Sequence, residues 1–95
     1  EDLIINQKTK KVKRNNVEII LTPREYQILL KLASAQGNVV TKQELIKEIW
    51  GRSFDANTNT IEVFINFLRN KIDKPFPLKL IKTKIGYGYY LEYKQ

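Results

Sequence analysis

The sequence predicts an α+β fold in which a small antiparallel sheet, three helices and a C-terminal β-hairpin follow one another along 95 residues. Two observations lead to this prediction: short β-type segments occupy both ends of the chain, and three capping-box signatures divide its middle. A content of 42% hydrophobic and 11% aromatic residues is enough for one core and too much for a disordered tail. We therefore expect one folded domain over residues 1–95.

The predicted N-terminal sheet comprises residues 3–5, 11–14 and 17–21. Asn15 and Asn16 separate the last two segments, and asparagine tolerates the positive φ angles of a tight hairpin turn. Basic side chains gather on this sheet: Lys8, Lys10, Lys11, Lys13 and Arg14. They are compatible with a nucleic-acid patch, but such charges more often form a solvated face or protect an edge strand from self-pairing. We favour the second interpretation.

Three capping-box signatures predict where the helices begin. The pairs are Thr22 with Glu25, Thr41 with Glu44, and Asn59 with Glu62. In a capping box, the two side chains bind N–H groups that the first helical turn leaves unpaired. The helices are expected to end at Gly37, at Gly51 and shortly before Pro75, because glycine and proline terminate helices.

Apolar residues at helical spacing predict the buried face of each helix. They are Tyr26, Leu29, Leu30 and Ala33 in the first helix; Leu45, Ile46, Ile49 and Trp50 in the second; and Ile61, Ile65, Leu68 and Ile72, flanked by Phe64, in the third. Each helix is therefore amphipathic, as expected of a three-helix core.

The C-terminal segment predicts a β-hairpin from residues 80–83 and 89–93, with glycines at 86 and 88 near its turn. Two helices with a short linker, a third after a longer linker, and then a basic hairpin make a winged helix-turn-helix. In that arrangement the last helix enters the DNA major groove and the hairpin, or wing, contacts the flanking backbone.

The predicted outer face of the third helix is unusual for a solvated helix. It carries Glu62, Val63, Asn66, Phe67, Arg69, Asn70 and Asp73. Asn66 and Asn70 are spaced i, i+4, as are Val63 and Phe67, so each pair is presented together. Asparagine can bond adenine and an apolar side chain can contact the thymine methyl, which suits A·T pairs. For Phe67, packing against a neighbouring element or a second subunit is an equally good interpretation.

The net charge of +7 and a pI of about 9.7 favour a polyanionic partner, and nucleic acid before a small molecule. The third helix carries little net charge, so phosphate attraction is expected elsewhere. Candidates are Arg52 in the long linker, Lys79, Lys82 and Lys84 in the hairpin, the hydroxyls of Thr60 and Thr83, and the N-termini of the second and third helices.

The chain contains no histidine and no cysteine, which removes the usual general base, the thiol nucleophile and most zinc ligand sets. We expect no enzymatic activity, no cofactor and no metal. No apolar run is long enough to span a bilayer, so we expect a soluble, cytoplasmic protein. Because Glu1 is not preceded by an initiator Met, we also expect these residues to be part of a longer polypeptide.

The sequence resembles the C-terminal DNA-binding domain of OmpR/PhoB-type bacterial two-component response regulators, over nearly its whole length. The motifs that carry the resemblance are residues 21–26 (LTPREY), 37–45 (GNVVTKQEL), 49–51 (IWG), 59–63 (NTIEV), 68–69 (LR), and Thr83 with 86–89 (GYGY). The resemblance implies a four-stranded N-terminal sheet, the three-helix core and the wing. It also implies a phosphorylatable receiver domain before Glu1, a sensor histidine kinase that acts through it, and head-to-tail binding of two copies to direct DNA repeats.

Residue by residue, the resemblance implies DNA contacts by Trp50, Thr60, Arg69, Thr83 and Tyr89. In the family, arginine often stands where this chain has Asn59, Asn66, Phe67 and Ile85, and histidine where it has Phe64. The full set of expected DNA-binding residues is Trp50, Asn59, Thr60, Val63, Asn66, Phe67, Arg69, Asn70, Lys82, Thr83, Lys84 and Tyr89. The linker after Gly51 faces RNA polymerase in the family, and here Arg52, Phe54 and Asp55 are the candidate contacts.

Two other functions are weighed against sequence-specific binding to double-stranded DNA. In the first, the domain is a protein-interaction module that docks a partner through Val63 and Phe67, and the excess charge serves solubility. The second is a hydrolase with an Asp/Glu pair, but no two acidic residues are spaced as such a site requires. A transcription-factor domain is the function that the sequence favours.

Overall fold

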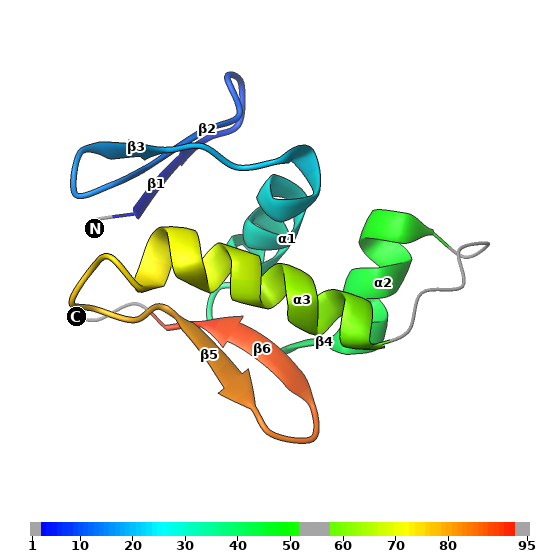
Figure 1. The fold of residues 1–95 in the computed structure, drawn as a ribbon. Helices are drawn as coiled ribbons and strands as arrows, with labels where there is room; N and C mark the ends of the chain where they lie inside the picture. Colours follow the sequence, from blue (N-terminus) through cyan, green and yellow to red (C-terminus); the bar gives the residue numbers. More distant parts are fainter. Residues whose placement is uncertain (1–2, 52–57, 93–95) are drawn as a thin grey trace.

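The computed structural model describes residues 3–51 and 58–92, in the predicted order of sheet, helices and hairpin (Figure 1). The N-terminal sheet consists of β1 Leu3–Asn6, β2 Lys11–Arg14 and β3 Val17–Ile19, antiparallel in the order β1-β2-β3. Asn15 and Asn16 form the turn between β2 and β3 with φ angles of 53° and 67°. The implied fourth strand is wrong for this sheet over the described residues, because β4 pairs in the other sheet.

The helices are α1 Pro23–Ser34, α2 Lys42–Trp50 and α3 Thr58–Leu68, which continues into a π-helical turn, η1 Arg69–Asp73. The first two capping boxes are confirmed. The hydroxyl oxygens of Thr22 and Thr41 accept the N–H groups of Glu25 and Glu44 at 3.3 and 3.0 Å. Each glutamate in turn accepts the backbone N–H of its threonine at 2.9 Å. In Figure 1, α3 runs between the N-terminal sheet and the hairpin.

The predicted cap of the third helix is wrong. The helix already includes Thr58, so Asn59 lies within its first turn, whereas a capping residue needs a non-helical backbone. The carboxylate of Glu62 instead accepts a hydrogen bond from Lys42 Nζ at 3.0 Å. This bond joins the start of α2 to the first turns of α3.

The hairpin forms a second sheet with the strand that precedes α2. Its strands are β4 Val40–Thr41, β5 Ile81–Lys84 and β6 Gly88–Leu91, antiparallel in the order β4-β6-β5. A Cβ atom at Gly88 would lie 2.1 Å from the carbonyl oxygen of Val40. Only glycine therefore lets β6 approach β4 this closely, which ties the wing to the helical core.

The core confirms the predicted stripe of the third helix and corrects that of the first. Ile61, Ile65, Leu68 and Ile72 are at most 1% exposed. In α1, Leu30 and Ala33 are only half-buried, while Ile28 and Leu32 are fully buried. Over residues 3–51 and 58–92, no helix combines the length and apolar character needed to cross a bilayer.

Asp73 is buried at 4% exposure, which overturns its predicted place on the outer face of the third helix. In η1 the N–H of Lys74 donates to the carbonyl of Arg69, five residues back, at 2.8 Å. This wider turn rotates the side chains that follow it relative to an α-helix. The Asp73 carboxylate accepts the backbone N–H groups of Leu80 and Ile81 at 2.9 and 3.0 Å.

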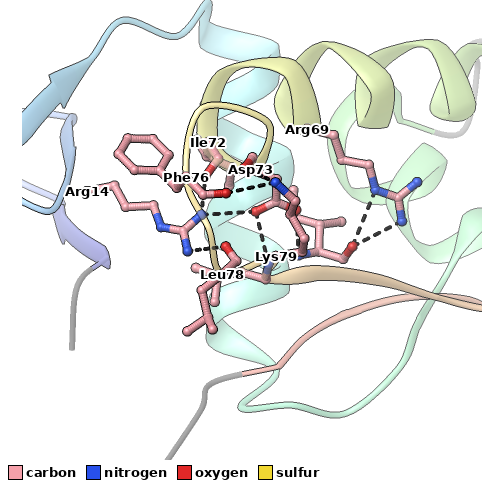
Figure 2. Close-up of polar contacts among 9 residues, drawn as sticks. Arg14, Arg69, Ile72, Asp73, Phe76, Leu78 and Lys79 are labelled. Atoms are coloured by element: carbon pink, nitrogen blue, oxygen red, sulfur yellow. Dashed lines mark hydrogen bonds and ion pairs between the residues drawn. The ribbon is translucent and has the colours of Figure 1, made fainter.

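Arg14 is also buried, at 0% exposure, although it was predicted on a solvated sheet face. Alternation along β2 places it on the same inner face as the buried Val12. Its guanidinium donates to the carbonyl oxygens of Ile72 and Leu78 and pairs with Asp73 at 3.2 Å (Figure 2). The four lysines of this region are exposed, as predicted: Lys8, Lys10, Lys11 and Lys13.

Candidate nucleic-acid interface

The outer face of α3 and η1 presents two amides and two large apolar side chains to solvent. Val63 and Phe67 are 47% and 45% exposed, and Asn66 and Asn70 are both exposed. The opposite side of the same helix is the fully buried stripe of isoleucines and leucine. The structure therefore brings together the four residues that were expected to read base edges.

Phe67 is the exposed end of a row of three aromatic rings. Its ring centroid lies 5.7 Å from that of Phe64, which lies 5.4 Å from that of Trp50, both in edge-to-face geometry. The guanidinium of Arg24 lies 4.6 Å from the Trp50 ring centroid. Phe67 thus packs against Phe64 while the residue as a whole stays 45% exposed. Trp50 itself is half-buried.

The first turn of α3 contains two of the expected DNA-binding residues. Asn59 is exposed and Thr60 is half-buried. Beside them, the hydrogen bond to Glu62 raises the pKa of Lys42, which outweighs the opposing effect of its burial. Lys42 Nζ also lies 6.0 Å from the ring centroid of Tyr89. Lys42 is thus a cation paired with Glu62 beside the first turns of α3, a feature that sequence patterning did not single out.

The wing presents its polar and basic residues unevenly. Thr83 and Lys84 are exposed, and Lys82 is half-buried. Ile85 and Tyr87 at the hairpin tip are 89% and 66% exposed. Of the residues expected to bind phosphate, Thr83 and Lys84 are therefore accessible and Lys82 is accessible in part.

Two residues that were expected near DNA also make contacts within the fold. Tyr89 is only 4% exposed, so its ring belongs to the core and offers little surface to a ligand. Lys79 donates to the carbonyl oxygens of Asp73 and Phe76 at 2.9 and 2.7 Å, which closes the loop before β5.

Arg69 is half-buried and bonds to the wing rather than projecting from the helix. Its Nε and Nη2 atoms donate to the carbonyl oxygen of Ile81 at 3.3 and 3.1 Å, and Nη2 donates to Thr83 Oγ1 at 2.7 Å. In Figure 2 the Arg69 guanidinium and that of Arg14 lie on opposite sides of Asp73. η1 and the base of the wing are thus one connected polar structure.

A hollow of about 550 Å³ lies where η1 meets the base of the wing. Its lining residues are Asn66, Arg69, Asn70, Asp73, Lys74, Lys79 and Ile81. Lys74 is exposed and was missed by the sequence interpretation, because it follows the predicted recognition face. The residues expected to face RNA polymerase, Arg52, Phe54 and Asp55, lie outside the described residues. Within the described part of the chain, no three acidic, Cys or His side chains gather as a metal site would require.

Comparison with known proteins agrees with this architecture. The family model described as "Transcriptional regulatory protein, C terminal" matches residues 16–91. The transcriptional regulatory protein HprR of Escherichia coli K12 is 49% identical over 78 residues, which cover 82% of this chain and 35% of HprR. The chain therefore spans about a third of that relative.

Two solved structures share the fold. The response regulator DrrB of Thermotoga maritima, described as an OmpR/PhoB homologue, has a TM-score of 0.84 and 32% identity, covering 96% of this chain and 42% of DrrB. The DNA-binding domain of Klebsiella pneumoniae RstA, solved in complex with the RstA box, has a TM-score of 0.83 and 25% identity, covering 96% of this chain and 91% of that one. On this evidence the chain belongs to the family of C-terminal DNA-binding domains of OmpR/PhoB-type response regulators, which are transcriptional regulators.

Proposed function

We propose that this domain binds double-stranded DNA sequence-specifically, with α3 in the major groove and the wing on the flanking backbone, and thereby controls transcription. The observation that supports this proposal most strongly is the exposed face of α3. It combines Asn66 and Asn70 with Val63 and Phe67, beside a wing that carries basic side chains. A face exposed only for solubility would be expected to carry Lys and Glu instead.

The chemistry of this face favours A·T pairs. An asparagine amide can donate to adenine N7 and accept from adenine N6, and apolar side chains can contact the thymine methyl. Asn66 and Asn70 are one helical turn apart, as are Val63 and Phe67. Each pair would therefore face neighbouring base pairs in the groove.

Phosphate binding is assigned to the wing and to the start of α3. Lys82 and Lys84 supply positive charge, and the hydroxyl groups of Thr83 and Thr60 supply neutral donors. Asn59 and the N-terminal end of α3, with its positive dipole end, are further candidates for phosphate binding. Trp50, packed on Phe64, supports the recognition helix from behind.

The chain spans about a third of HprR, so the activity of the full protein is a further proposal. We infer that a receiver domain precedes this domain, that a sensor histidine kinase acts on it, and that two copies bind head to tail on direct repeats. The segment with Arg52, Phe54 and Asp55 is proposed to face RNA polymerase. We assign this protein to the cytoplasm, where its DNA and its polymerase are found.

The experiment compares Asn66→Ala with Lys82→Ala on a duplex selected from a random pool and on a scrambled duplex. Loss of one bidentate base contact reduces discrimination between the duplexes by about 1–3 kcal/mol, so Asn66→Ala is expected to lower the ratio of the two affinities. Lys82→Ala is expected to weaken both duplexes alike and to lower the salt slope by about one unit.

Two matched variants control for the loss of an amide or a charge elsewhere on the surface. Asn38→Ala and Lys8→Ala change exposed loop residues that belong neither to α3 nor to β5 and β6, and both should leave affinity and discrimination unchanged. Unchanged discrimination in Asn66→Ala would overturn the assignment of the α3 face. Self-association without duplex binding would instead favour docking of a protein on Val63 and Phe67.

A further inference from the structure

The first residue of β5 is held from two directions by the end of the recognition helix. The N–H of Ile81 donates to Asp73 Oδ2 at 3.0 Å, and its carbonyl oxygen accepts from Arg69 Nε and Nη2 at 3.3 and 3.1 Å. The neighbouring N–H of Leu80 donates to Asp73 Oδ1 at 2.9 Å. Arg69 and Asp73, the first and last residues of η1, thus act on the same stretch of the wing (Figure 2).

The Arg69 guanidinium directs most of its donors to the wing. A guanidinium carries five N–H groups, of which Nε has one and Nη2 has two. Those three groups fit the three hydrogen bonds to Ile81 and Thr83, and the guanidinium lies 5.8 Å from the Tyr89 ring centroid. Because Thr83 Oγ1 is an acceptor in this bond, its own proton remains available for a phosphate oxygen.

The acidic side of this arrangement is anchored more deeply. Asp73 is 4% exposed and pairs with Arg14, which is 0% exposed and belongs to the N-terminal sheet. Its carboxylate therefore has a fixed position, set by β2 on one side and by the β5 backbone on the other. A buried carboxylate held in this way cannot itself contact DNA, but it determines where the wing begins.

We propose that Arg69 and Asp73 are positioning residues that hold the wing at one orientation relative to α3, so that helix and wing reach DNA as a single rigid unit. In this proposal Arg69 acts through Ile81 and Thr83 rather than by binding a phosphate itself. Rigid presentation lowers the ordering cost of binding, since the wing need not be immobilised when the helix docks. The consequence for DNA binding rests on the function proposed above, whereas the rigidity of the wing does not.

A measurement without DNA tests the rigidity. The chain has no cysteine, so Asn70→Cys with Tyr87→Cys accepts two spin labels, one on η1 and one at the wing tip. With Arg69 intact, the distance between the two labels should show one narrow distribution. Arg69→Met should broaden this distribution, because methionine keeps the apolar stem and loses every hydrogen-bond donor. Lys71→Met is the matched control: it removes a nearby cation that bonds to Glu25 in α1 rather than to the wing.

A second measurement tests the consequence for binding. Lys84→Ala should weaken the selected duplex by about fivefold in the parent and in Lys71→Met, but less than about twofold in Arg69→Met, where a loosened wing contributes little. Arg69→Lys should behave like Arg69→Met, since an ammonium lacks the planar fork that spans both acceptors. Thermal unfolding shows whether Arg69→Met folds. If it does not fold, Arg69→Lys takes its place in both measurements.

A distribution in the Arg69 variants as narrow as in the parent overturns the proposal. So does a Lys84→Ala effect that is undiminished in these variants, because a residue needed only for stability would not alter it. Loss of duplex binding in every protein, with broadening still present in the Arg69 variants, would refute the DNA-binding function while supporting the positioning role.

Discussion

Replacing Arg14 by methionine tests how strongly the buried ion pair joins the N-terminal sheet to η1, at the end of α3. Methionine fills much of the same space but removes the donors to Ile72, Leu78 and Asp73. The Asp73 carboxylate would remain buried and would keep its hydrogen bonds from the backbone N–H groups of Leu80 and Ile81. Breaking a buried pair on one side costs about 3–5 kcal/mol, because it leaves an uncompensated charge.

That cost is a large part of the stability of a domain of this size. At about 0.05–0.15 kcal/mol per residue, 95 residues give about 5–14 kcal/mol in total. A loss of about 3 kcal/mol should therefore lower Tm by about 12–24 °C, at 4–8 °C per kcal/mol for small domains. The assay is urea unfolding followed by circular dichroism, supported by thermal scans.

The double variant separates the charge from the hydrogen bonds. Arg14→Met with Asp73→Asn removes both charges, so it should cost less than the sum of the two single variants by at least about 2 kcal/mol. Asparagine keeps one acceptor oxygen for the β5 backbone. A single Arg14→Met cost below about 1 kcal/mol, or additive single costs, would refute the reasoning.

Three further predictions concern packing, pH and the wing tip. Gly88→Ala should destabilise the domain by about 1–3 kcal/mol in urea unfolding, because its Cβ would meet the Val40 carbonyl oxygen at 2.1 Å; an unchanged midpoint would contradict this. Burial raises the pKa of Glu25, but hydrogen bonds from Lys71 and Thr22 lower it by more, so the net pKa is below its usual 4.5. Its contribution is therefore complete above pH 4.5 and lost as the pH falls through the lower folded pKa, and Glu25→Gln should flatten the decline in unfolding free energy with acid; an equally steep decline would exclude this role. Ile85→Arg should strengthen binding to all duplexes and raise the salt slope by about one unit, because the side chain is 89% exposed at the tip; an unchanged slope would mean that the tip faces away from DNA.

Local signals predicted the parts of the fold that local interactions determine. Each capping box, at Thr22 and at Thr41, spans four consecutive residues, so the residue types alone are sufficient to predict the starts of α1 and α2. The buried stripe from Ile61 to Ile72 was likewise predicted by the helical spacing of its apolar residues. The same signature at Asn59 failed, because it does not reveal whether the helix has already begun.

The polar centre of the molecule could not be predicted from the sequence. Arg14 and Asp73 are 59 residues apart, and each looks like an ordinary surface charge in its own segment. The π-helical turn also breaks the 100° period on which the placement of Asp73 depended. The family resemblance implies that Arg69 contacts DNA. Its hydrogen bonds to Ile81 and Thr83 become visible only when β5 is placed beside η1.

Selection of bound duplexes from a randomised pool at near-physiological salt tests the central claim most directly. Salt titrations of the winning duplex and a scrambled control should follow, because the affinity of a protein for DNA depends strongly on the salt concentration. Tandem reading by α3 predicts enrichment of an A·T-containing direct repeat with a period of about 10–11 bp, bound more tightly than the control at every salt concentration. Binding without any enriched sequence, or no binding at all, would contradict sequence-specific recognition by this domain.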